Sequence, residues 1–205
     1  MNITRAEIDA MESRYRAALM NSVTGYKPAN LVGSCDGEGV TNLAIMSSAV
    51  HLGSHPPLVM LVLRPVAAAQ HTLENILATK HYTLNHVHSD FYKAAHQTAA
   101  RYDRDVSEFD EVGLTPLWRD GFTAPFVQEA AIRIGLELRE HRPLEINGTQ
   151  LLIGEIVSLD VPAGALMDDG SIQLEAAGSV ALSGLDSYFE TRLLDRLPYA
   201  KPGNG

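Results

Sequence analysis

A glycine-rich turn between two apolar segments most constrains the fold of this chain; it reads Asp36-Gly37-Glu38-Gly39. Its two glycines permit the positive φ angles that a tight hairpin turn requires. The flanking residues 29–35 and 40–49 are therefore predicted to pair as antiparallel strands. This pairing is the basis on which the rest of the fold is predicted.

A continuous apolar segment, Leu58–Leu63, follows the hairpin. Pro56-Pro57 before it prevents a helix, so the segment is predicted to be a strand buried on both faces at the centre of the sheet. A short helix is then expected to begin at Thr72 as its N-cap, with Glu74 in the first turn where the helix dipole favours an acid. The predicted order is therefore a hairpin of two strands, a third strand and a helix.

The remaining pattern adds further strands and few helices. Alternating residues predict strands over 81–87, 132–138 and 151–161, and Asn147-Gly148 is typical of a hairpin turn between the last two. Helical spacing is found over about 4–20, expected to pack on the barrel from outside, and over 90–102, whereas 107–121 is expected to be irregular and to cover a site. Five or six strands with short turns indicate a mainly β fold, an antiparallel β-barrel with flanking helices.

Length and charge limit the classes of protein that fit. The 205 residues are predicted to form a single domain over 1–205, with a C-terminal tail from about 184 to 205. The formal net charge of -9 argues against a nucleic-acid role, because phosphate neutralisation needs a basic excess. No apolar stretch reaches the roughly 20 residues that cross a bilayer. With one cysteine and no leader pattern, a reducing, cytoplasmic location is expected.

Two groups of polar residues are candidates for binding. Arg64 at a strand end, followed by His71 and Thr72 at a helix start, offers the donors that a phosphate group needs. The alternative is that Thr72 is only a cap and Arg64 only a surface cation, and the spacing leaves both interpretations open.

The second group comprises small polar residues on or beside an otherwise apolar strand; they are Thr41, Asn42, Ser47 and Ser48. Such groups can hydrogen-bond the polar edge of a flat heterocycle while the backbone approaches it closely. The alternative is ordinary polarity at a strand end and turn, which the sequence alone favours.

Other kinds of site have less support. Gly33, Gly37 and Gly39 lie in a hairpin with no helix after it, which excludes a dinucleotide fingerprint. His86 and His88 can share a strand face, with His96 nearby, but no partner stands at a recurrent ligand spacing, so no metal site is assigned.

Three further features also have structural explanations. Cys35 beside the turn is typical of a packed thiol, and no nucleophile elbow supports a hydrolase. The acidic run Asp103–Glu111 is interpreted as a solvated face.

A succession of short motifs runs along most of the chain. They are Asn30-Leu31-Val32-Gly33, Asp36-Gly37, Thr41-Asn42-Leu43-Ala44, Ser47-Ser48, Pro56-Pro57-Leu58-Val59, Thr72-Leu73-Glu74-Asn75-Ile76, Tyr82-Thr83-Leu84-Asn85, Glu108-Phe109 with Gly113-Leu114, Ala124-Pro125 and Ile153-Gly154-Glu155-Ile156. In this order, over roughly residues 25–160, the chain resembles the flavin reductase-like family of FMN-binding split β-barrels. The ending Leu197–Pro202 resembles the tail of one branch of that family.

The resemblance implies a homodimer of antiparallel, Greek-key split barrels with FMN near the subunit interface. By the same resemblance, Asn42, Ala44, Ser47 and Ser48 line the flavin ring and ribityl chain, and Arg64, His71 and Thr72 hold the phosphate. Asn75 is also shared with the family and either contacts the cofactor or braces the helix. Tyr199 and Lys201 in the tail are candidates for closing over the cofactor.

The activity that the resemblance implies is an NAD(P)H:flavin reductase, which passes hydride from NADH or NADPH to FMN. The protein stacks and orients the rings, and no side-chain acid or base is assigned as catalytic. Many members have a histidine in the turn before residues 150–157, where this chain has Asn147-Gly148-Thr149-Gln150; His141 is the nearest substitute.

Two alternatives therefore stay open. One is an FMN-binding electron carrier or storage module without nicotinamide activity, and the other is a pyridoxamine-phosphate-oxidase-like or haem-binding relative on the same barrel. Expected partners are a monooxygenase or another electron acceptor, with neither nucleic acid nor membrane.

Overall fold

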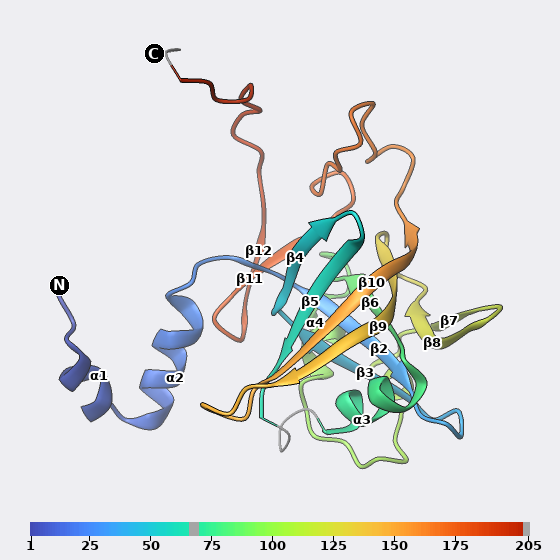
Figure 1. Cartoon of the computed structure of the whole chain (residues 1–205), viewed down its shortest axis with the longest axis horizontal. Helices are drawn as coiled ribbons and strands as arrows, with labels where there is room; N and C mark the ends of the chain where they lie inside the picture. Colours follow the sequence, from blue (N-terminus) through green and yellow to red (C-terminus); the bar gives the residue numbers. More distant parts are fainter. Residues whose placement is uncertain (66–69, 203–205) are drawn as a thin grey trace.

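The protein is built on a seven-stranded sheet that curls into a barrel (Figure 1). The structure is a computed structural model that describes residues 1–65 and 70–202, with Gln70 described by its backbone alone. Neighbouring strands are all antiparallel, in the order β3-β2-β6-β9-β10-β5-β4. Their bounds are β2 Asn30–Cys35, β3 Thr41–Met46, β4 Ala49–Ser54, β5 Pro57–Leu63, β6 His81–His86, β9 Arg133–Pro143 and β10 Gln150–Asp160. The predicted mainly β barrel is confirmed.

The barrel is split between its two outermost strands. β3 and β4 are the two edges of the sheet, although only Ser47 and Ser48 separate them in the chain. The predicted strand over 40–49 is therefore wrong at its end, because the chain turns a corner at these serines and changes edge.

The predicted hairpin is confirmed. Cys35 pairs with Thr41 and Asn30 with Met46, so the whole of β2 and β3 is in register. The carboxylate of Asp36 accepts from the backbone N–H groups of Glu38 and Val40, at 2.9 Å each. Gly39 has a φ of 95°, a conformation that favours glycine, whereas Gly37 does not have the positive φ predicted for it.

The central position predicted for Leu58–Leu63 is wrong. These residues lie in β5, which is second from the edge, while β6, β9 and β10 occupy the middle of the sheet. Every second residue of β5 is buried, namely Val59, Leu61 and Leu63, so the predicted burial on both faces is also wrong. An apolar run shows that a strand packs well but does not reveal its neighbours, which depend on long-range pairing.

Helix α3 (Gln70–Thr79) closes the barrel interior. Its Leu73 and Ile76 pack in one buried cluster with barrel residues such as Tyr82 and Leu136. The helix begins at Gln70, so Thr72 is a buried residue inside it rather than the predicted N-cap, and Glu74 lies beyond its first turn.

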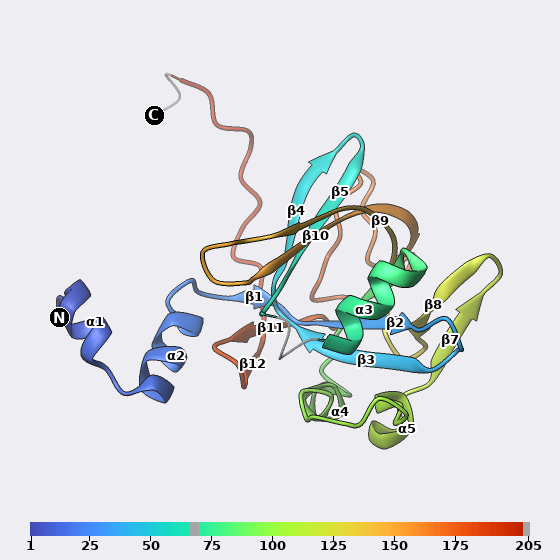
Figure 2. The ribbon, with the colours of Figure 1, turned by 60° about the horizontal axis from the view of Figure 1, so that its bottom comes forward.

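A second cluster of buried residues lies on the other side of β2 and β3, beneath α4 (Tyr92–Gln97) and α5 (Glu108–Val112). Figure 2 shows the two strands between α3 on one side and these short helices on the other. The helix predicted over 90–102 is thus shorter than expected. The irregular segment predicted over 107–121 instead contains α5 and β7 (Pro116–Arg119), which pairs with β8 (Phe122–Val127).

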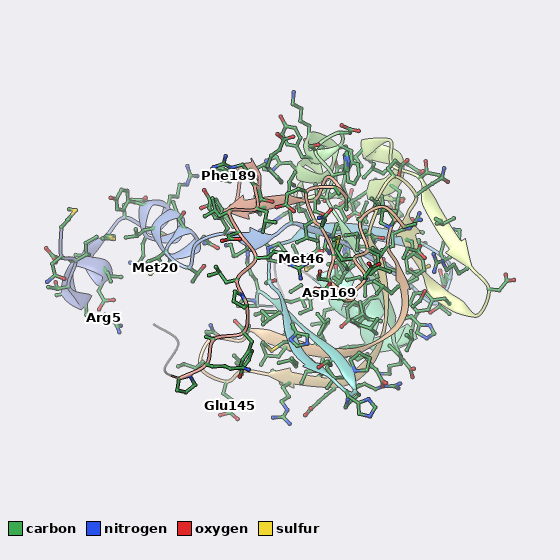
Figure 3. All side chains as sticks on the ribbon, turned by 90° about the horizontal axis from the view of Figure 1, so that it is seen from above. Arg5, Met20, Met46, Glu145, Asp169 and Phe189 are labelled. Atoms are coloured by element: carbon green, nitrogen blue, oxygen red, sulfur yellow. The ribbon has the colours of Figure 1, made fainter. Side chains whose placement is uncertain are left out.

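The predicted N-terminal helix is two helices, α1 (Arg5–Ala10) and α2 (Ser13–Ser22). They separate because Glu12 caps α2, its carboxylate accepting from the N–H groups of Arg14 and Tyr15. Neither helix buries a residue, and both stand clear of the barrel, as the positions of Arg5 and Met20 show (Figure 3). The expected packing on the barrel is therefore wrong.

The C-terminal part forms a small three-stranded sheet and an extended tail. β1 (Lys27–Pro28) pairs with β11 (Val180–Ser183), and β11 pairs with β12 (Ser187–Glu190). The tail leaves the barrel after β12 (Figure 1), and its last three residues lie outside the described part. None of the helices in residues 1–65 and 70–202 combines the length and apolar composition that crossing a membrane requires.

Candidate functional site

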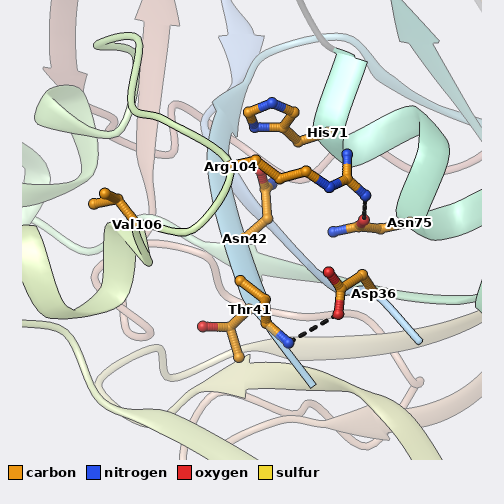
Figure 4. A pocket seen from close by; sticks show the side chains of 8 residues that line it. Asp36, Thr41, Asn42, His71, Asn75, Arg104 and Val106 are labelled. Atoms are coloured by element: carbon orange, nitrogen blue, oxygen red, sulfur yellow. Dashed lines mark hydrogen bonds between the residues drawn. The ribbon is translucent and has the colours of Figure 1, made fainter. Parts of the chain in front are cut away.

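A polar recess lies where the β2–β3 hairpin meets α3 and the segment before α5. Its cavity volume is about 10 Å³, room for roughly one water molecule, and its lining comes from Asp36, Val40, Thr41, Asn42, His71, Asn75, Arg104 and Val106. Figure 4 shows Arg104 reaching toward Asn75, with His71 and Asn42 beside it. Most of these groups are hydrogen-bond donors or acceptors, which suits a polar ligand.

Four of the predicted cofactor residues come together here. The Asn42 amide donates to Thr72 Oγ1 at 3.0 Å, which joins β3 to α3. Asn75 lies one turn further along the helix and donates to Ser34 Oγ at 3.4 Å. Asn42, Thr72 and Asn75 are all buried, while His71 at the rim is half-buried.

The other predicted residues gather at the split of the barrel. Ser48 is tied to β5, because its Oγ donates to the Val62 carbonyl at 2.5 Å and the Val62 N–H donates to its carbonyl at 3.1 Å. Arg64 follows two residues after Val62, is exposed, and makes no ion pair within the described residues. Ser47 and Ala44 lie half-buried on the way from this corner to Asn42. Their part in holding a cofactor stays a prediction.

Sequence reasoning missed the role of Glu108. The interpretation of Asp103–Glu111 as a solvated face is wrong for this residue, which is only 7% exposed. Its Oε2 accepts from the Leu43 N–H at 2.9 Å. Burial raises the pKa of the Glu108 carboxyl, while the Leu43 N–H bond and the nearby His71 oppose that rise. Two sequence signals pointed to it, namely the apolar Phe109 beside it and the place of Glu108-Phe109 in the succession of family motifs.

Arg104 was also missed. Its guanidinium forms an ion pair with Glu74 and donates to Asn75 Oδ1 at 3.5 Å. It therefore places a positive charge at the recess from a segment that the sequence marks as acidic. Long-range contacts of this kind leave no periodic signal in a single sequence.

His141, the nearest substitute for the turn histidine that many family members have, lies near the split of the barrel. His141 Nε2 is 2.7 Å from Gln150 Oε1, and Gln150 pairs across the sheet with Leu63, next to Arg64. The β9–β10 turn also lies close to Pro65, since a Cβ added at Gly148 would lie 3.5 Å from that ring. His141 is thus at the same end of the sheet as Arg64, although it is already hydrogen-bonded.

His86, His88 and Cys35 have structural surroundings. His86 Nδ1 lies 3.0 Å from Ser179 Oγ, and His88 Nδ1 accepts from the Asp90 N–H at 3.0 Å. Within the described residues, no three His, Cys, Asp or Glu side chains are grouped to hold a metal ion. Cys35 is buried, and that burial raises the pKa of its thiol, which favours the unreactive form.

Known proteins share this architecture. The family model of the flavin reductase like domain matches residues 26–174. A solved structure from Shewanella frigidimarina NCIMB 400, described as a candidate flavin reductase with a split barrel domain, has 49% sequence identity and a TM-score of 0.94, covering 98% of this chain and 100% of that chain.

Two more distant structures show the same fold. Nitrilotriacetate monooxygenase component B from Bacillus cereus is 23% identical with a TM-score of 0.84, over 96% of this chain and 98% of that chain. Flavoredoxin of Desulfovibrio vulgaris (Miyazaki F) is 24% identical with a TM-score of 0.72, over 87% and 92%. With its split barrel and the match over residues 26–174, the chain belongs to the flavin reductase-like family of flavin oxidoreductases.

Proposed function

We propose that this flavin oxidoreductase binds FMN and reduces it with NADH or NADPH. The observation that carries the proposal is the meeting of Asn42, His71 and Asn75 at one recess, with Thr72 hydrogen-bonded to Asn42, within the fold of this family. Along the chain, Asn42 on β3 is about 30 positions from the residues on α3. Their meeting is therefore a product of the tertiary fold.

The donor set fits a flavin phosphate. Arg64 has no counter-ion within the described residues, Ser47 has no hydrogen-bonded partner there, and His71 stands at the start of α3. A cation, a hydroxyl and the positive end of a helix dipole together favour a phosphate dianion. Thr72 and Ser48 already have partners in the protein, so their part is to shape the site.

The residues named here bind and orient. The flavin, when bound, supplies the hydride chemistry at its N5 atom. The protein provides a strand with Asn42 and Ala44 on one face, the Arg64 cation at the split of the barrel, and a ring hydrogen-bonding group on His71 at the recess. No side chain is required to donate or remove a proton in that transfer.

An electron carrier or storage module without nicotinamide activity is the second candidate. The β9–β10 turn has no histidine, and the ring of His141 is hydrogen-bonded to Gln150. Flavoredoxin, which shares the fold, carries a name that fits such a role.

The visible spectrum of the purified protein distinguishes these candidates. A flavin reductase is expected to show paired flavin bands that bleach when NADH or NADPH is added without oxygen. Bleaching by dithionite but by neither nucleotide would remove the reductase and leave the carrier. A Soret band would instead indicate a haem-binding relative, and titration with FMN and FAD would show which flavin binds more tightly.

Partners are proposed on the same basis. Component B of nitrilotriacetate monooxygenase is by its name one part of a larger system, and it shares this fold. We propose that reduced flavin passes from this chain to a partner monooxygenase or another acceptor, and that the chain acts as a homodimer. The exposed apolar side chains of its N-terminal helices and tail support the homodimer.

A further inference from the structure

The candidate flavin strand β3 is an edge strand whose outer side is covered by side chains. The N–H groups of Leu43 and Ile45 are two residues apart and donate away from β2. In an antiparallel sheet such groups meet the next strand, and on an edge they are otherwise left unpaired.

The segment from Ala95 to Glu108 supplies the missing acceptors. Glu108 Oε2 accepts from Leu43 at 2.9 Å, and Thr98 Oγ1 accepts from Ile45 at 2.9 Å. The Thr98 hydroxyl is itself oriented, since it donates to the Ala95 carbonyl at 2.8 Å. A third contact, 2.6 Å between Thr41 Oγ1 and Ser107 Oγ, holds the start of the strand. Side chains thus replace a strand along β3.

A buried carboxylate at this position requires an explanation. Desolvation disfavours the charge, and the protein recovers part of that cost through a hydrogen bond from a backbone donor. Loss of the carboxylate would leave the Leu43 N–H buried without an acceptor, which is more harmful than losing a solvated contact. Glu111 on the same helix is exposed and carries no such constraint.

The covered edge is directly connected to the proposed binding site. Asn42 precedes Leu43, and its amide reaches Thr72 in α3 at 3.0 Å. A displacement of β3 at Leu43 would therefore change the distance from Asn42 to α3 and the position of Ala44.

We propose that Glu108, assisted by Thr98, is a positioning residue that holds β3 in the geometry needed for flavin binding. This proposal rests on the proposed function. It assigns to the 95–108 segment a role that differs from contact with the flavin, because its polar groups act on the backbone of β3.

The test compares Glu108→Ala and Glu108→Gln, with Glu111→Ala as the matched control on the same helix. Glu108→Ala is expected to raise the FMN dissociation constant about tenfold, as loss of one charge-assisted hydrogen bond would. Glu108→Gln keeps an acceptor oxygen and should recover most of the affinity, and Glu111→Ala should leave the affinity unchanged.

Hydrogen exchange should quicken at the Leu43 amide in Glu108→Ala alone. A folded Glu108→Ala protein with wild-type affinity and exchange would overturn the proposal.

A milder pair of variants serves if Glu108→Ala does not fold. Thr98→Val removes the acceptor for Ile45, and Thr98→Ser retains a hydroxyl. The proposal expects weaker FMN binding and faster Ile45 exchange in the valine variant only; equal behaviour of both variants contradicts it. If the wild-type protein binds no FMN, the proposed function fails, whereas exchange at Leu43 and Ile45 still reports on the covering of β3.

Discussion

At the scale of single residues, Gly33 shows how tightly the strands approach one another. It lies on β2, opposite Leu43 on one side and Thr83 on the other. A Cβ at this position would lie 2.2 Å from the Pro125 carbonyl oxygen and 2.5 Å from Thr83 Oγ1. The first of these is backbone and cannot rotate away, so β2 tolerates only a glycine here.

Gly33→Ala is expected to lower the free energy of unfolding by about 3 kcal/mol, because an added methyl in a filled core forces the backbone apart. Gly37→Ala is the matched control, since a methyl group at that position would have no neighbouring atom within 4 Å and the φ of Gly37 is not in the left-handed region. The control should change stability by no more than about 0.5 kcal/mol. Urea denaturation measures both, and equal stabilities would contradict the close approach.

At the scale of elements, the small sheet β1-β11-β12 is joined to the barrel by the residues that follow β6. Val180 donates to the Val87 carbonyl at 3.0 Å, and Ser89 donates to the Gly178 carbonyl at 3.2 Å. His86 Nδ1 adds a side-chain contact to Ser179 at 3.0 Å within this seam. Burial lowers the pKa of His86 from 6.5 to about 4, because the seam disfavours an imidazolium charge.

This seam should make stability depend on pH. The unfolded chain binds a proton at His86 more readily than the folded protein, so the free energy of unfolding falls as the pH drops from 6.5 to about 4. The loss from this group is up to about 3 kcal/mol. His86→Asn keeps a polar group but does not ionise, and denaturation at pH 7 and pH 5 should show a smaller difference in this variant. The same pH dependence in both proteins would exclude His86 as the cause.

At the scale of the whole molecule, both ends of the chain extend from the barrel with apolar side chains exposed. On the N-terminal helices and the link after them these are Tyr15, Met20, Val23 and Tyr26, and on the tail they are Leu193, Leu194, Leu197 and Tyr199. Such side chains on extended arms are typical of a surface that packs against another chain. A second copy is the proposed partner.

Analytical ultracentrifugation tests this proposal. The wild-type protein is expected to sediment as a dimer. The double variant Tyr15→Ser with Met20→Ser should raise the dimer dissociation constant at least about tenfold, because buried aromatic and methionine side chains carry much of an interface's binding energy. Arg14→Ser, exposed on the same helix, is the control and should sediment like the wild type. A monomeric wild-type protein would contradict the assignment.

Local signals account for what the sequence predicted well. The Asp36–Gly39 turn and the Asn147-Gly148 turn each place a glycine where the backbone has a positive φ, at Gly39 and Gly148, and alternation identified β9 and β10. Failures occurred where a residue's role depends on a distant partner. Thr72 resembles a cap but lies within a helix against Asn42, and Glu108 resembles a solvated acid but covers the edge of β3.

By itself, the sequence determined the antiparallel β character, the hairpin and the polar residues that belong to this family, because turn chemistry and side-chain periodicity act over a few residues. Only the tertiary structure decided that β5 lies next to an edge, that the barrel is split at Ser47-Ser48, that Arg104 lines the recess and that Glu108 covers the edge of β3. These outcomes depend on which strands pair across the sheet and which loops pack on its edges, and such contacts join residues too distant in the chain for any local pattern to record.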